Sequence, residues 1–140
     1  MPTAEEFNEF NRGVIAEFRQ RGGEVSGRFA GAPMILVNHV GAKSGKAYTA
    51  PLVYTRSEDS YVVLASKGGA PEHPQWFHNL VAQPDVTVEV GTETIPVRAR
   101  VAEGDERARL FRAQADQMPN FDQYATSTDR EIPVVVFERS

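Results

Sequence analysis

The fold is decided by residues 34–54, MILVNHVGAKSGKAYTAPLVY, in which two apolar runs flank a short polar segment. Both runs, residues 34–40 and about 48–54, are rich in the β-branched and aromatic side chains that favour strands. The turn between them, Gly41-Ala42-Lys43-Ser44-Gly45-Lys46, contains two glycines that suit a chain reversal. The stretch therefore predicts an antiparallel β-hairpin, since so short a connection cannot join parallel strands.

Outward from this hairpin, the sequence predicts four more strands and three helices. Strands are expected over residues 60–65, 86–90, 94–101 and 132–137. Helices are expected over about residues 3–21, 74–83 and 105–117. Six short strands, mostly joined as hairpins and decorated by peripheral helices, predict an α+β fold built on a small antiparallel barrel. With 140 residues and no repeat or long linker, the chain is expected to form a single domain over residues 1–140.

Composition and charge exclude several classes of protein. Hydrophobic residues make up 41% of the chain and charged residues 24%, as in an ordinary globular domain. The sequence has no cysteine, which rules out disulfides, thiolate catalysis and cysteine-bound metals. No apolar run approaches the ~18 residues of a membrane span, and no signal segment opens the chain, so a cytoplasmic protein is expected. A formal net charge of -4 argues against a nucleic-acid partner, which would require a basic surface.

The turn at residues 41–46 is a candidate anion site. Amide N–H groups exposed in a glycine-containing turn can bind an anion, and Lys43 and Lys46 add positive charge on either side of the Ser44 hydroxyl. The alternative is a plain hairpin turn, which also favours glycine and tolerates lysine. The spacing of a P-loop is absent.

A second polar segment, residues 65–80 (ASKGGAPEHPQWFHNL), carries the single tryptophan and two of the three histidines. Lys67-Gly68-Gly69 follows a strand and allows the backbone to approach a flat ligand closely. The next helix places Trp76 and Asn79 on one face, where an indole beside an amide can form a wall for an aromatic ligand. The alternatives are a plain loop and a buried anchor role for Trp76.

The histidines do not indicate a metal site. His73 and His78 are five residues apart, and no carboxylate stands at a spacing that would complete a helical site. His39 is expected to be a structural or cross-strand residue. Ser66 with either downstream histidine would pair a nucleophile with a base, but the nucleophile elbow of hydrolases is missing, so hydrolysis is not expected.

Several motifs along the chain form a recognisable set, spread from Met34 to Phe137. They are Gly41-x-Lys43-Ser44-Gly45, Pro51-Leu52, Ala65-Ser66-Lys67-Gly68-Gly69, His73-Pro74-x-Trp76-Phe77-His78-Asn79-Leu80 and Asp129-Arg130-x-Ile132-Pro133-Val134-Val135. Together they closely resemble the deazaflavin-dependent nitroreductase family of actinobacteria, the nitroreductase-like branch of the flavin and deazaflavin oxidoreductases. The resemblance implies a split β-barrel of the pyridoxamine-phosphate-oxidase-like type. It also implies the 8-hydroxy-5-deazaflavin coenzyme F-420, whose reduced form donates hydride.

The resemblance also implies roles for particular residues. Coenzyme binding is assigned to Lys43, Ser44, Gly45, Lys46, Ser66, Lys67, Gly68, Trp76 and Asn79. A substrate pocket is assigned to Val53, Met118, Phe121 and Tyr124. Ser66, as a hydrogen-bond donor to the developing anion, and Tyr124, as a proton donor or positioning group, are the catalytic candidates.

The chain departs from the family pattern at two positions. Ala42 and Tyr48 stand where the family usually has arginine. Bidentate guanidinium contacts are therefore replaced by the point charges of lysine, which predicts either a weaker hold on the coenzyme tail or compensation by Lys46 and Arg56.

The activity implied is hydride transfer from the reduced coenzyme to a quinone, an activated enone or unsaturated lactone, or a nitro compound. Because Val53, Met118 and Phe121 are apolar, hydrophobic quinones and lactones are expected to react better than nitroimidazole prodrugs. The alternatives are a deazaflavin-binding or storage protein without catalysis, a reductase that uses FMN on the same barrel, and an interaction barrel with no ligand. A monomer or homodimer is expected, and the stripe of Phe7, Phe10 and Phe18 on the first helix leaves open a weak peripheral membrane contact.

Overall fold

The computed structural model describes residues 4–26, 31–65, 73–118 and 131–140, and in the first helix it describes side chains from Asn11 onward. The helices in these ranges are α1 (Ala4–Gln20), α2 (Gln75–Ala82) and α3 (Gly104–Gln117). The strands are β1 (Met34–Val40), β2 (Ala47–Val53), β3 (Thr55–Ser57), β4 (Ser60–Leu64), β5 (Asp85–Val90), β6 (Glu93–Val101) and β7 (Val134–Arg139).

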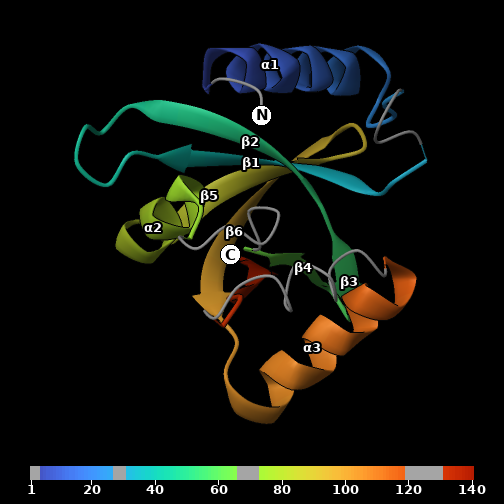
Figure 1. The fold of residues 1–140 in the computed structure, drawn as a ribbon, viewed down its shortest axis with the longest axis vertical. Helices are drawn as coiled ribbons and strands as arrows, with labels where there is room; N and C mark the ends of the chain where they lie inside the picture. Colours follow the sequence, from blue (N-terminus) through green and yellow to red (C-terminus); the bar gives the residue numbers. More distant parts are fainter. Residues whose placement is uncertain (1–3, 27–30, 66–72, 119–130) are drawn as a thin grey trace.

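All of these strands belong to one antiparallel sheet in the order β2-β1-β5-β6-β7-β4-β3 (Figure 1). The sheet curls strongly, so that it has a concave and a convex face. Its two edge strands, β2 and β3, are consecutive in the chain and are separated by Tyr54 alone. This architecture confirms the predicted α+β fold of mostly antiparallel strands with peripheral helices, and the expected barrel is present as a strongly curled sheet.

The hairpin predicted from residues 34–54 is present as β1 and β2, whose register runs from Met34 opposite Val53 to Val40 opposite Ala47. Successive side chains of β1 point to opposite faces of the sheet. Ile35 and Val37 therefore face the concave side, where they join the main cluster, and Leu36 faces the convex side beneath α1.

The concave face holds the largest hydrophobic cluster. It is formed by Ile35, Val37, Tyr61, Val63, Leu80, Val88, Ile95, Val97, Ala99, Val135 and Phe137. Leu80 comes from α2, whose Trp76 and Phe77 also pack against the cluster, so this short helix covers part of the concave face. Burial of each large aliphatic or aromatic side chain contributes about 1.5–3 kcal/mol, which makes this cluster the main source of stability.

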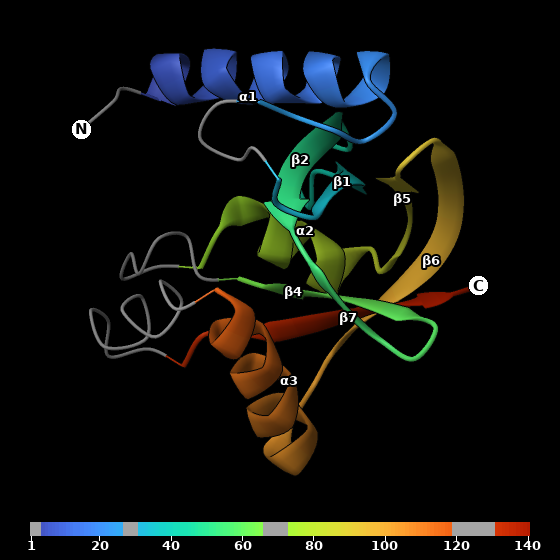
Figure 2. The ribbon, with the colours of Figure 1, turned by 90° about the vertical axis from the view of Figure 1, so that its right-hand side faces the viewer.

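The convex face is covered by the two other helices, α1 at one end and α3 at the other (Figure 2). Leu110 of α3 packs with Val62 and Val136 of the sheet. Phe18 of α1 packs with Leu36 and is only 1% exposed, so this residue does not belong to a membrane-facing stripe. Among the described residues, no helix combines the length and apolar character that a bilayer crossing requires.

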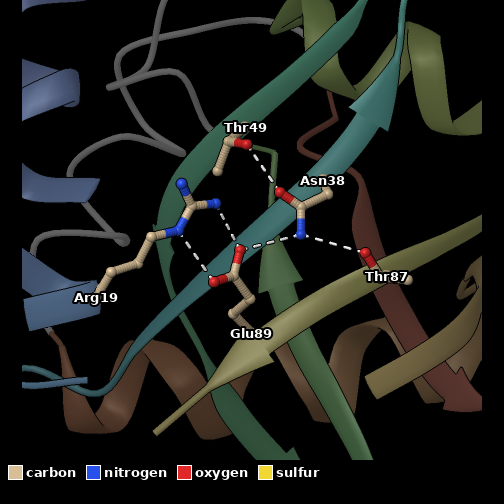
Figure 3. A network of polar contacts seen from close by, with 5 residues as sticks. All are labelled: Arg19, Asn38, Thr49, Thr87 and Glu89. Carbon is tan, nitrogen blue, oxygen red and sulfur yellow. Dashed lines mark hydrogen bonds and ion pairs between the residues drawn. The ribbon is translucent and has the colours of Figure 1, made fainter. Parts of the chain in front are cut away.

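A polar network fastens the C-terminal end of α1 to the sheet (Figure 3). The Arg19 guanidinium donates to both carboxylate oxygens of Glu89, at 3.1 and 2.7 Å. The Asn38 amide donates to Glu89 Oε2 at 3.1 Å and to Thr87 Oγ1 at 3.2 Å, and Asn38 Oδ1 accepts from the Thr49 hydroxyl at 2.7 Å. The hydrogen bond from Arg19 lowers the pKa of Glu89. One helix is thus tied through side chains to β5, β1 and β2.

The strand count differs from the prediction of six. The additional strand is β3, which pairs with β4 and lies between the strands expected at about 48–54 and 60–65, where no strand was predicted. The turn between β3 and β4 is short and includes Glu58, which adopts a positive φ of 56°. A strand of three residues is too short to show an alternating pattern in the sequence.

Candidate functional site

The turn that joins β1 to β2 has a closed hydrogen-bonded geometry. The amide of Gly41 donates to the carbonyl of Lys46 at 2.8 Å, and the amide of Gly45 donates to the carbonyl of Gly41 at 3.0 Å. The Ser44 hydroxyl accepts from the amide of Lys46 at 3.2 Å. A side chain at position 41 would lie 2.5 Å from Ser44 Oγ, and Gly45 has a φ of 71°, so the turn requires both glycines.

This geometry leaves donors that face outward. Within the described part of the chain, the amide groups of Lys43 and Ser44 donate to no protein acceptor, and the side chains of Lys43 and Lys46 form no ion pair. Residues 42–46 are all exposed. Two adjacent backbone donors accompanied by two ammonium groups are a donor set that suits a phosphate or carboxylate.

A side chain of α2 hydrogen-bonds to the turn. Asn79, which is 1% exposed, accepts through Oδ1 from the Ala42 amide at 3.0 Å and from Gln75 Nε2 at 3.1 Å. Its Nδ2 atom lies 2.9 Å from Nδ1 of His39, which is 6% exposed. The Asn79 side chain therefore reaches the turn rather than open solvent, and it fixes the turn to the helix.

His39 has the cross-strand position that the sequence predicted. It lies opposite Tyr48 in the β1–β2 register, and the two rings stack with centroids 5.7 Å apart and planes at 22°. Burial lowers the pKa of His39. Tyr48 is 46% exposed, so the chain has an accessible aromatic ring at a position where the family usually has arginine.

Trp76 lies on the first turn of α2 and is half-buried against the concave cluster. Part of the indole packs against the core and the rest is accessible, and its role as a wall for an aromatic ligand stays a prediction. Pro74 occupies the N-cap position and makes no side-chain capping bond, while its carbonyl accepts from Phe77 at 3.1 Å. The helix begins one residue later than predicted.

Two residues of the predicted substrate pocket are described. Val53 is half-buried at the end of β2, and Met118 is half-buried immediately after α3, where it packs against the cluster beneath that helix. Thr55, two residues beyond Val53, donates to Gln114 Oε1 at 3.3 Å, and the Met118 amide donates to the Gln114 carbonyl at 2.9 Å. The two pocket residues therefore lie next to, in sequence or by hydrogen bond, the Thr55–Gln114 contact between β3 and α3.

A separate groove of about 220 Å³ lies beside α2. It is lined by Phe77, Leu80, Val81, Pro84, Ala99, Arg100, Val101 and Val135. Neither Val53 nor Met118 lines it, and no sequence pattern indicated it.

The remaining predicted site residues lie outside the described ranges. They are Ser66, Lys67, Gly68, Phe121 and Tyr124. Their assignment to coenzyme binding, the substrate pocket and catalysis stays a prediction.

The histidines next to α2 form a ring cluster. His73 and His78 have ring centroids 5.9 Å apart, and both rings contact Phe77. In residues 4–26, 31–65, 73–118 and 131–140, no group of three or more potential ligands gathers as a metal site would require.

Comparison with known proteins places this geometry in context. A family-wide sequence model described as F420H2-dependent quinone reductase matches residues 10–139. A Mycobacterium tuberculosis protein named F420H2-dependent quinone reductase is 39% identical over 128 residues, which cover 89% of this chain and 86% of that protein.

Solved structures agree with this match. A structure described as an F420-H2 dependent reductase has a TM-score of 0.70 and 40% identity, covering 76% of this chain and 94% of that one. A second, described as a domain-swapped dimer, has a TM-score of 0.72 and 35% identity over 97% of this chain and 100% of that one. At 10% identity and a TM-score of 0.54, a structure from Listeria innocua in the pyridoxamine 5'-phosphate oxidase class shares the fold alone; it covers 94% of each chain.

The curled sheet and its lysine-flanked turn define a protein of the split β-barrel class with a candidate anion site. Within that class, the extent of the sequence match decides the family. The chain belongs to the F420H2-dependent quinone reductase family.

Proposed function

We propose that this chain transfers hydride from F420H2, the reduced form of coenzyme F-420, to a quinone. Family membership identifies the chain as an oxidoreductase that uses this coenzyme. The observation on the structure that carries the proposal is the turn at residues 41–46, with two outward amide donors and two exposed lysines.

The donor set fits the coenzyme, whose tail carries a phosphodiester and carboxylates. Such an anion requires hydrogen-bond donors and positive charge but no metal, and the turn offers both. The half-buried Trp76, on the helix that holds the turn, is proposed to lie against the flat deazaflavin ring. Lys67 and Gly68 are proposed to complete the coenzyme site.

The bound coenzyme supplies the hydride, and the protein supplies binding, orientation and a proton. A quinone that accepts a hydride becomes an anion, which one proton converts to the hydroquinone. We assign that proton to the Tyr124 hydroxyl and a hydrogen bond to the developing oxyanion to the Ser66 hydroxyl. Val53, Met118 and Phe121 are proposed to exclude water from the acceptor.

A fluorescence titration with F-420 tests the coenzyme site directly. Lys43→Ala and Lys46→Ala should each weaken binding roughly tenfold, because each removes one charge-assisted contact to an anion. Arg109→Ala is the matched control, since it removes one exposed positive charge from α3 at the far end of the convex face. If both lysine variants bind like wild type, or if the control loses as much affinity as they do, the assignment of the turn is wrong.

Turnover separates the enzyme from a storage protein. Steady-state oxidation of F420H2 in the presence of a quinone is expected for the enzyme, while binding without oxidation would identify a storage protein. A protein that carries FMN after purification and ignores F-420 would instead be a flavin reductase on the same fold.

The finer parts of the proposal concern acceptors and assembly. Nitro compounds and unsaturated lactones are proposed as further acceptors, which would connect this chain to the nitroreductase-like branch. A homodimer is proposed because a 35% identical solved structure is a domain-swapped dimer, and light scattering at several concentrations measures it. Peripheral membrane contact through Phe7 and Phe10 is tested by sedimentation with lipid vesicles.

A further inference from the structure

The carboxamide of Asn79 has only one orientation that satisfies its neighbours. The backbone amide of Ala42 can only donate, so the Asn79 atom that faces it at 3.0 Å must be the oxygen. The nitrogen of the same carboxamide then faces Nδ1 of His39 at 2.9 Å. Because that nitrogen can only donate, Nδ1 must accept, and the imidazole must be neutral with its proton on Nε2.

A second proton on His39 would break this arrangement. Nδ1 would become a donor and would face the Asn79 nitrogen, another donor, across a buried contact. Rotation of the carboxamide by 180° would satisfy His39, but it would turn Nδ2 toward the Ala42 amide, which also only donates. No orientation of Asn79 serves both neighbours when His39 is charged.

We infer that neutral His39 fixes the orientation of Asn79 and thereby holds the turn at residues 41–46 in its anion-binding shape, and that a proton on His39 releases the turn. His39 is a positioning residue in this account, because it acts on the turn through Asn79. The predicted loss of coenzyme affinity in acid rests on the proposed function, whereas the coupling of His39 to the turn does not.

The groups around His39 make the neutral state the resting one. Tyr48 covers the ring from β2, and Asn79, which also bonds to Gln75, approaches from α2, where His78 is exposed. Lys43 and Lys46 lie in the adjoining turn. The nearest carboxylate on β5, Glu89, bonds to Asn38 and so lies on the opposite face of β1. Burial lowers the pKa of His39, which places the release on the acidic side of ~6.5, the usual value for histidine.

Nuclear magnetic resonance of the protein without coenzyme tests the coupling. Between pH 5 and 8, the Ala42 amide resonance should move with the same midpoint as the imidazole nitrogens of His39. His39→Asn places an amide oxygen near the position of Nδ1 and keeps an acceptor that does not titrate, so the Ala42 resonance should lose this transition. His78→Asn is the matched control and should retain it. An Ala42 resonance that stays constant in wild type, or that still titrates in His39→Asn, overturns the inference.

Coenzyme titrations at pH 5.5 and 7.5 test the consequence. The dissociation constant at pH 5.5 divided by that at pH 7.5 should be roughly tenfold larger for wild type than for His39→Asn. This factor corresponds to the loss of about one hydrogen bond to a charged group. Ionisation of the coenzyme itself affects both proteins equally at a given pH, so it cancels from this comparison. Equal ratios would overturn the link between His39 and binding. Failure of every variant to bind F-420 at either pH would contradict the proposed function instead, and the magnetic resonance titration would still decide the coupling.

Discussion

A single methyl group at position 41 would disturb the candidate anion site. The added Cβ would lie 2.5 Å from Ser44 Oγ and 3.2 Å from Tyr48 Cε2, so the Ser44 hydroxyl would have to rotate away from the Lys46 amide. Single residues therefore have a large effect at this turn, where Gly41, Ser44 and Lys46 hydrogen-bond to one another or to their neighbours. The anion binding proposed for this turn would depend on its shape as much as on the charges of Lys43 and Lys46.

Gly41→Ala is expected to lower the free energy of unfolding by about 1 kcal/mol, the worth of one hydrogen bond, and to weaken F-420 binding. Gly13→Ala is the matched control: Gly13 is exposed on α1 with no atom within 4 Å of an added Cβ. That change should raise the free energy of unfolding by roughly 0.5–1 kcal/mol, because alanine favours a helix. Urea unfolding of both variants measures the difference, and a harmless Gly41→Ala would refute the role given to the turn.

His39 should also make stability depend on pH. Its folded-state pKa is lowered by burial, so the unfolded chain takes up a proton at a higher pH than the folded one. Stability is therefore lost as pH falls below ~6.5, and the loss stops growing below the folded-state pKa. Wild type should lose more stability than His39→Asn between pH 7.5 and 5 in urea unfolding. Parallel curves for the two proteins would contradict this.

Asn79 shows where prediction from the sequence ended. Its role beside Trp76 in a coenzyme site stays a prediction, and the structure shows its side chain buried against the turn at residues 41–46. What the sequence could not show is that its carboxamide is occupied by Ala42, Gln75 and His39, because these contacts bring together residues as many as 40 positions apart. The local pattern identifies a polar residue, but only the fold identifies its partners.

At the scale of elements, helix α1 is the clearest case of a long-range attachment. Phe18 and Val14 pack against β1, and Arg19 reaches Glu89, which is 70 residues away in sequence. The helix itself was predicted from its periodicity, and the hairpins were predicted from their apolar runs and the turn residues between them. The short β3 and the Arg19–Glu89 pair were not, since neither three residues nor two distant charges leave a local pattern.

Arg19→Ala is expected to lower the free energy of unfolding by about 1 kcal/mol, because a mostly buried Glu89 loses its cation. Arg21→Ala removes a cation whose pairs with Glu17 and Glu24 are more exposed, and it should cost at most about 0.5 kcal/mol.

The pKa of Glu89 is lowered, so its stabilising effect is present above pH 4.5 and is lost as pH falls toward the folded-state pKa.

Unfolding at pH 7 and hydrogen exchange of the α1 amides measure this attachment. The difference between wild type and Arg19→Ala should shrink below pH 4.5, whereas Arg21→Ala should leave α1 exchange close to that of wild type. Equal exchange in all three proteins would show that apolar packing alone holds the helix.

At the scale of the whole molecule, the distribution of charge separates the candidate site from the rest of the surface. The net charge is -4, yet all three lysines of the chain, at positions 43, 46 and 67, fall in the two segments assigned to the coenzyme. A local positive field on an acidic protein can attract an anionic ligand while the remaining surface repels it. Coenzyme binding is therefore expected to weaken as salt is added.

Acceptor preference is a property of the whole pocket. With Val53, Met118 and Phe121 as its assigned walls, the specificity constant kcat/KM should be roughly tenfold or more higher for a hydrophobic quinone than for a nitroimidazole. Val53→Tyr adds a hydroxyl at one wall and should narrow this ratio, while Val81→Tyr, on the exposed side of α2, should not. Rapid turnover of nitroimidazoles by wild type would refute the assignment of an apolar pocket.

The position of Tyr54 between the two edge strands has a further consequence. Tyr54 joins β2 directly to β3, so the two edges of the sheet cannot separate unless the backbone at Tyr54 changes conformation. A circular permutant opened at Tyr54 would keep every strand pairing within the sheet yet free both edges at once. Each edge strand already has a row of backbone groups that no neighbouring strand pairs, and separating the two edges would make both more accessible, so the permutant is expected to polymerise strand to strand more readily than the natural chain.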